Sequence, residues 1–141
     1  MMNKPILILF LLALISCSKE QEKLELFSEE AFAYYLEDSW ELNATARVKG
    51  FTQLEDDDDN YSAKLSYSID LITPSADTLS DVDYGLVDEL KDEEMIDLEI
   101  ETQIEIDSSF SVGKYKIVFH VEDNLSQRSV SSEKEFSLSK E

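Results

Sequence analysis

Residues 61–71, YSAKLSYSIDL, alternate without interruption between apolar and polar side chains. A period of two is typical of a β-strand that has one buried and one wet face. The run stops before Pro74, which cannot donate a hydrogen bond to a strand ladder. Further runs of the same kind occupy residues 40–48, 96–106, 115–121 and 130–138. The chain is therefore predicted to be all-β.

Strands with one wet face belong to antiparallel sheets, and five or more of them must bury their apolar faces against one another. This predicts a two-sheet sandwich. Residues 111–124, SVGKYKIVFHVEDN, resemble the last hairpin of immunoglobulin-like, fibronectin-type and cadherin-like domains. In those domains a Gly-x-Tyr enters the penultimate strand and an Asp-Asn turn follows it. The resemblance implies an immunoglobulin-like Greek-key sandwich of about six to eight strands.

Two segments do not follow this simple pattern. Residues 28–36 fit a short helix capped by Ser28, and they equally fit a strand in which Phe32, Tyr34 and Leu36 alternate. Residues 77–94 carry apolar side chains spaced by four, so we expect an acidic loop with some helical turn there. A short edge strand followed by a crossover loop is the alternative.

The first 17 residues, MMNKPILILFLLALISC, have the features of a secretory signal. Lys4 supplies a positive charge, and the apolar run 6–15 is shorter than the ~20 residues that a membrane span requires. Residues 14–17, LISC, resemble the lipobox of bacterial lipoproteins. The resemblance implies that residues 1–16 are cleaved and that Cys17 becomes lipidated. We expect a polar tether over 17–27 and a sandwich domain over 28–141.

The polar segment 18–23, SKEQEK, resembles the export signal of surface lipoproteins in the Bacteroidota. This resemblance implies an outer-membrane anchor with the domain on the cell surface. A tether facing the periplasm is the alternative.

The charge balance restricts the partners of the chain. The sequence has 12 basic and 32 acidic residues, and loss of Lys4 with the leader leaves 11 basic residues, for a formal charge of −21. Such a field repels nucleic acids and anionic lipid headgroups. The lipid anchor alone is therefore expected to hold the protein at the membrane. Cys17 is the sole cysteine, which excludes an internal disulfide and a thiolate metal cluster.

The residues needed for common hydrolytic mechanisms are scarce. His120 is the one histidine, and it is out of phase with the apolar residues of 115–121, which predicts a half-exposed position on the wet face. The sequence has no Gly-x-Ser-x-Gly elbow, P-loop or dinucleotide fingerprint. Pairs of carboxylates are uninformative among so many acids. We therefore predict no catalytic residues and no enzyme activity.

An acidic turn, EDDDDN over residues 55–60, is a candidate calcium ligand set. Asp56, Asp58 and Asn60 match the first half of an EF-hand loop, but Tyr61 replaces its glycine. Asp123 lies in a second cluster of side-chain oxygens. The alternative is a solvated turn that discourages strand association. No other cofactor is expected.

Residues 77–79, DTL, resemble the O-glycosylation pattern of the Bacteroidota, which would make Thr78 a sugar acceptor. The function expected from these features is that of a non-catalytic binding or accessory module for an envelope protein or glycan. The alternatives are an acidic surface-coat lipoprotein without a specific ligand and a calcium-stabilised adhesion module. Exposed aromatic residues would favour binding, and those to inspect are Trp40, Tyr34, Tyr35 and Tyr84.

Overall fold

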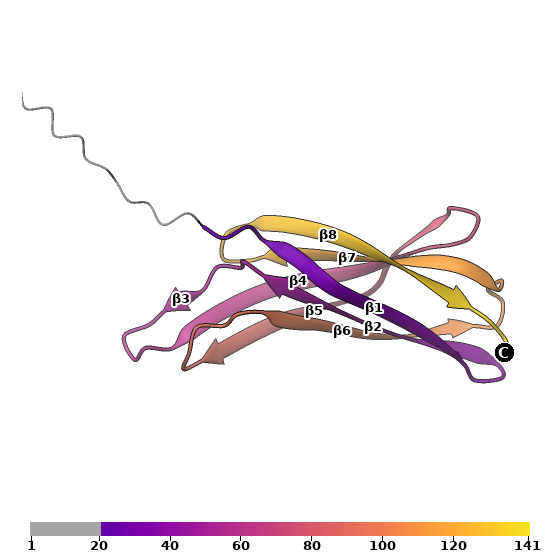
Figure 1. The fold of residues 1–141 in the computed structure, drawn as a ribbon, viewed down its shortest axis with the longest axis horizontal. Helices are drawn as coiled ribbons and strands as arrows, with labels where there is room; N and C mark the ends of the chain where they lie inside the picture. The colour runs from indigo at the N-terminus through magenta and orange to yellow at the C-terminus, as the bar shows by residue number, and fades with distance from the viewer. Residues whose placement is uncertain (1–20) are drawn as a thin grey trace, which may run out of the picture.

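The computed structural model describes residues 21–141, which form eight β-strands and no helix. The strands are β1 (Glu25–Tyr35), β2 (Ser39–Lys49), β3 (Leu54–Glu55), β4 (Tyr61–Ile72), β5 (Thr78–Lys91), β6 (Leu98–Asp107), β7 (Gly113–Asp123) and β8 (Arg128–Leu138). They run along the long axis of an elongated molecule (Figure 1). The alternating runs identified in the sequence thus correspond to strands of the structure.

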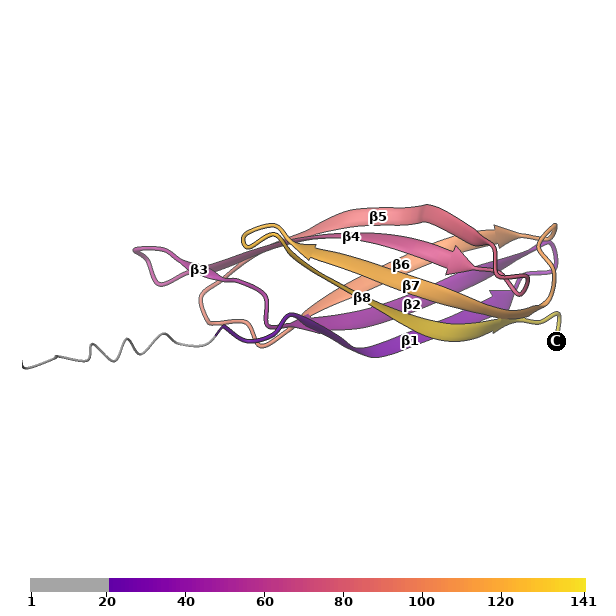
Figure 2. The same cartoon turned by 90° about the horizontal axis from the view of Figure 1, so that it is seen from above.

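The strands form two antiparallel sheets packed face to face (Figure 2). One sheet has the order β1-β2-β6. In the other, β4 lies between β5 and β7, β8 continues beyond β7, and the short β3 pairs with the start of β4. The chain changes sheet between β2 and β3, between β5 and β6, and between β6 and β7. This confirms the predicted antiparallel sandwich.

The core fills the space between the sheets. Every second side chain of β2, β4 and β7 points inward, and Trp40, Leu65 and Phe119 have no exposed surface. The buried apolar residues form one cluster that extends from Leu24 to Leu138. Strands β1 and β8 lie side by side and close one flank of the sandwich, whereas β5 and β6 approach each other more loosely.

Strand β1 decides the open question at residues 28–36 in favour of a strand. Its pairing with β2 shifts between Phe27 and Glu30, and Ser28 has a φ of 53°. Such a bulge adds one residue and reverses which side chains face inward. Leu26 before it and Ala31 after it are both buried, whereas Phe32, Tyr34 and Leu36 face solvent.

The start of the strand also lies earlier than the predicted domain boundary. Leu24 and Leu26 belong to the core, although both fall in the range assigned to the tether, 17–27. The predicted signal and Cys17 lie outside the described residues.

The expectation of a loop with helical turn at 77–94 was wrong, because residues 78–91 form the long edge strand β5. It pairs with β4 along nearly its whole length. Gly85 lies opposite Tyr67, and a Cβ at Gly85 would be 2.5 Å from the Tyr67 hydroxyl, so the tyrosine lies across the glycine. Ile96, expected in the next strand, precedes β6 and is exposed.

Candidate functional site

The outer face of the larger sheet brings polar residues from four strands into register. Because paired residues in adjacent strands project on the same side, each set of partners forms a row across the sheet. One row contains Tyr84, Ser68, His120 and Ser131. The next contains Leu86, Ser66, Glu122 and Ser129.

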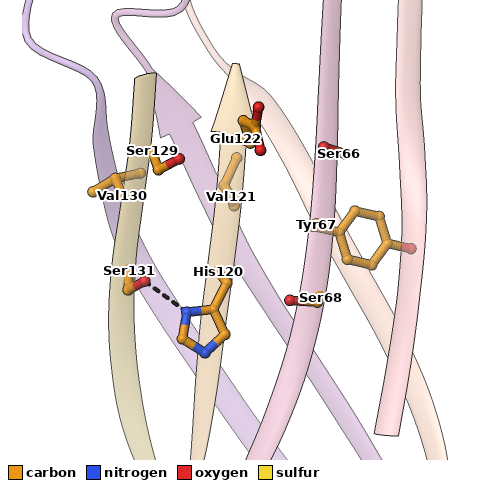
Figure 3. Close-up of a pocket in the computed structure, with 9 residues that line it drawn as sticks. All are labelled: Ser66, Tyr67, Ser68, His120, Val121, Glu122, Ser129, Val130 and Ser131. Atoms are coloured by element: carbon orange, nitrogen blue, oxygen red, sulfur yellow. Dashed lines mark hydrogen bonds between the residues drawn. The ribbon is translucent and has the colours of Figure 1, made fainter. Parts of the chain in front are cut away.

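The small serines leave a shallow hollow over β4, β7 and β8 (Figure 3). Its volume is about 330 Å³, and hydroxyl groups, an imidazole and a carboxylate dominate its surface. Tyr67 adjoins the hollow with its main chain, and its ring points toward β5. The side chains that offer hydrogen bonds to a ligand here are Ser66, Ser68, Glu122, Ser129 and Ser131.

His120 is held between a carboxylate and a hydroxyl. Its Nε2 lies 2.8 Å from Asp70 Oδ2. Its Nδ1 lies 2.7 Å from Ser131 Oγ, the contact that Figure 3 draws. The prediction of a half-exposed histidine on the wet face is confirmed. The two hydrogen bonds fix the ring orientation, so the imidazole presents a fixed edge to the hollow.

A carboxylate, a histidine and a serine joined in this order by hydrogen bonds also form the constellation used in acyl transfer. In that reaction, hydrogen-bond donors must stabilise an oxyanion. The neighbour of His120 along β7 on this face is Glu122. Its negative charge opposes the development of an oxyanion in the hollow. The arrangement is better suited to binding neutral hydroxyl or amide groups.

The hollow is flanked on the β5 side by exposed apolar side chains. Tyr84, Leu86 and Leu90 are 76%, 70% and 64% exposed. They share the outer face with the serines of β4, since Tyr84 pairs with Ser68 and Leu86 with Ser66. A ligand seated over β4 would therefore meet hydroxyl groups on one side and an apolar surface on the other.

The aromatic residues singled out in the sequence divide between core and surface. Trp40 is fully buried, and its Nε1 donates to the Ser139 carbonyl at 2.9 Å. Tyr35 packs beside it with a ring-centroid distance of 5.3 Å. Tyr34 and Tyr84 are exposed on the outer faces of different sheets.

In the turn proposed to bind calcium, the carboxylate of Asp56 is hydrogen-bonded to main-chain groups of the turn itself. Asp56 accepts hydrogen bonds from the main-chain N–H groups of Asn60 and Asp58, both at 2.9 Å. These bonds, chiefly that from the Asn60 N–H, lower the pKa of Asp56. Across residues 21–141, no group of three or more His, Cys, Asp or Glu side chains is arranged to hold a metal ion.

Asp123 has a different role from the residues of this turn, because its buried carboxylate is hydrogen-bonded to three neighbouring residues. Its carboxylate accepts from the N–H groups of Thr52 (2.7 Å) and Leu125 (3.0 Å) and from Arg128 Nη2 (3.3 Å). Arg128 also donates to the Gly50 carbonyl at 2.7 Å. The four predicted ligands Asp56, Asp58, Asn60 and Asp123 therefore do not share one site.

Thr78, the proposed sugar acceptor, is exposed at the first position of β5 and next to the β4–β5 turn. The attachment of a sugar to Thr78 stays a prediction.

Comparisons with known proteins add no family: the sequence matches no protein-family model, and no curated protein matches it significantly. Within the described part of the chain there is also no helix with the length and apolar character that a membrane crossing requires.

Of these side chains the sequence analysis singled out His120 alone, and the two residues that hold its ring, Asp70 and Ser131, are among those it missed. Their signal was present, because both are out of phase with the buried residues of their strands, as His120 is. The phase predicts the face on which a residue lies but not its neighbour across the sheet. That neighbour is fixed by long-range pairing of β4, β7 and β8.

Proposed function

We propose that this chain is a lipid-anchored, non-catalytic binding module of the cell envelope. The observation that carries the proposal is the exposure of Tyr84 and Leu86 beside the polar hollow on one sheet face. Large apolar side chains that are exposed together, next to convergent polar groups, are typical of binding surfaces. A coat protein that only solvates the surface has no need of them.

The chemistry of the face favours a neutral, polar ligand with an apolar side, such as a glycan or a peptide segment. The hollow supplies hydroxyl groups and the ring carbons of the oriented His120, and Tyr84 supplies an aromatic face at its border. Glu122 and the net charge of −20 disfavour anionic ligands. The anchor rests on the signal and Cys17 in the sequence.

The binding role is tested by recovering partners from the native cell envelope with the full chain. A Ser68→Arg variant fills the hollow from the outer face of the sheet, and Ser137→Arg on β8, which also adds one positive charge, serves as the charge-matched control away from it. We expect a partner that the control retains and the Ser68→Arg variant loses. A reproducibly identical recovery with both variants, or none with the unmodified chain, would count against the proposal.

The anchor is tested separately. A Cys17→Ser variant is expected to escape lipoprotein processing, so its apparent mass should differ from that of the parent chain. If it remained in membranes at an unchanged apparent mass, the lipid anchor would be excluded.

A further inference from the structure

Strand β5 is an open edge of the larger sheet. Among the described residues it pairs only with β4, and its outward row carries Tyr84, Leu86 and Leu90. The corresponding edge of the smaller sheet, β6, is different, because its outward row consists of Glu99, Glu101, Gln103 and Glu105. Charged side chains on an edge strand discourage pairing with another chain, and β6 has this protection. The outward row of β5 has one charge, Asp88, among large apolar residues.

The free main-chain groups of β5 can be identified from one hydrogen bond. The Tyr84 N–H donates to the side chain of Asp83 at 2.9 Å and therefore not to the main chain of β4. In an antiparallel ladder, every second residue directs its main-chain groups to the same side. Leu86, Asp88 and Leu90 therefore direct their N–H and C=O groups to the open edge. These groups form a template for the addition of another strand.

We propose that two copies of this chain pair antiparallel through β5, with Leu86 of one copy opposite Asp88 of the other. In this register Tyr84 lies opposite Leu90, which pairs apolar side chains on the outer face. Asp83 lies opposite Lys91, which pairs opposite charges on the inner face. Such cross-strand pairs stabilise a sheet.

The sequence of β5 disfavours the neighbouring registers. A slip of two residues in one direction places Asp88 opposite Asp88, and a slip in the other direction places Asp83 opposite Glu89. Like charges directly opposite are destabilising. A shift by one residue would pair outward with inward side chains. One register therefore fits both the face and the charges.

The two-fold axis of such a dimer is perpendicular to the sheets. The starts of β1 in the two copies would then lie toward opposite ends of the dimer but at the same height along the axis (Figure 1, Figure 2). Both could reach one membrane if the sheets lay parallel to it, with the hollows of both copies on the same side. The pairing itself requires neither a ligand in the hollow nor the proposed binding function.

The response to salt distinguishes a second copy of this chain from a basic peptide as the partner of the β5 edge. Each copy carries a formal charge of −20, so salt should strengthen self-pairing by screening repulsion between the domains. Salt should instead weaken the addition of a basic strand from another protein. One edge contact is small compared with stable interfaces, so the pairing is expected to be weak and concentration-dependent.

The test is cysteine cross-linking between two differently tagged, co-expressed full-length chains, one Leu86→Cys and the other Asp88→Cys. Directly hydrogen-bonded pairs have Cα atoms about 5.5 Å apart, within the range that a disulfide spans. Both positions are exposed, so the fold should tolerate the changes. The parent chain with Cys17 alone controls for its own thiol, and the pair Glu101→Cys with Gln103→Cys controls for the β6 edge.

We expect the Leu86→Cys and Asp88→Cys mixture to form a disulfide-linked heterodimer at least several-fold above either variant alone and above the β6 control. Its yield should rise between roughly 0.05 and 0.5 M salt. Equal yields in the mixture and the controls would overturn the pairing. A dominant Leu86→Cys homodimer would overturn the register, and a yield that falls with salt would point to a different occupant of the edge.

Discussion

Replacing Asp123 with Asn should destabilise the domain by about 3–5 kcal/mol, the usual loss when one partner of a buried ion pair is removed. Asp123 is fully buried and accepts hydrogen bonds from Thr52, Leu125 and Arg128. Asparagine keeps the shape but has one carbonyl oxygen, so its NH₂ group must face at least one of these donors. Arg128 also loses its countercharge.

The loss should depend on pH. Burial acts to raise the pKa of Asp123, but hydrogen bonds from Thr52, Ser126 and Leu125 together outweigh it, so the pKa is lowered. A carboxyl whose folded pKa lies below its unfolded value of ~3.9 stabilises the fold above that value. This stabilisation disappears as the pH falls through the folded pKa. The difference between the two proteins should be constant near neutral pH and should narrow below about pH 4.

Urea unfolding with linear extrapolation measures the free energy of unfolding, and thermal melting should show a fall of about 10–20 °C. Glu122→Gln is the matched control, because Glu122 is the adjacent acid and is exposed. We expect that control to change stability by no more than about 0.5 kcal/mol. A loss under about 1 kcal/mol for Asp123→Asn, or a difference that stays constant to low pH, would refute the reasoning.

Three further outcomes follow from the structure. Gly50→Ala should cost more than about 2 kcal/mol in urea unfolding, because Gly50 has a φ of 78° and a Cβ would lie 2.0 Å from the Lys23 carbonyl oxygen; a neutral result would contradict this contact. Trp40→Phe should lose about 1–3 kcal/mol by the same assay, since it leaves the Ser139 carbonyl without its donor and shrinks a fully buried ring. Thermal melting in millimolar Ca²⁺ or Mg²⁺ should give equal shifts, because the described acids form no shared ligand set; a shift specific to Ca²⁺ would instead support the calcium hypothesis.

Wherever a strand is regular, the sequence predicted correctly which side chains face the core and which face solvent. In β2, β4 and β7 the alternation of the residues is also the alternation of burial. The prediction of faces failed in β1, where a bulge with Ser28 at a positive φ changes the phase. Strand β5 has a similar irregularity near Asp81, whose φ is 54°. Neither position carries the glycine that would have indicated a bulge.

The candidate site could be predicted only in part, because its parts are far apart in the sequence. The phase of His120 identified its wet face, but its contacts with Asp70 and Ser131 depend on which strands pair. The acidic turn shows the opposite problem. A run of carboxylates indicates possible ligands, but it does not reveal that Asp56 is already bonded to its own main chain.

The bulge in β1 links the packing of the core to the composition of the surface. In its observed phase, the second half of β1 buries Ala31 and exposes Phe32 and Tyr34. The other sheet contributes the large rings of Tyr115 and Phe119 to the core cluster in which β1 places the small side chain of Ala31. The exposed aromatics are thus not required for core packing. Exchanging Tyr34 for Ser should therefore leave the stability within about 0.5 kcal/mol, so any loss of partner binding in that variant would report on recognition rather than on folding.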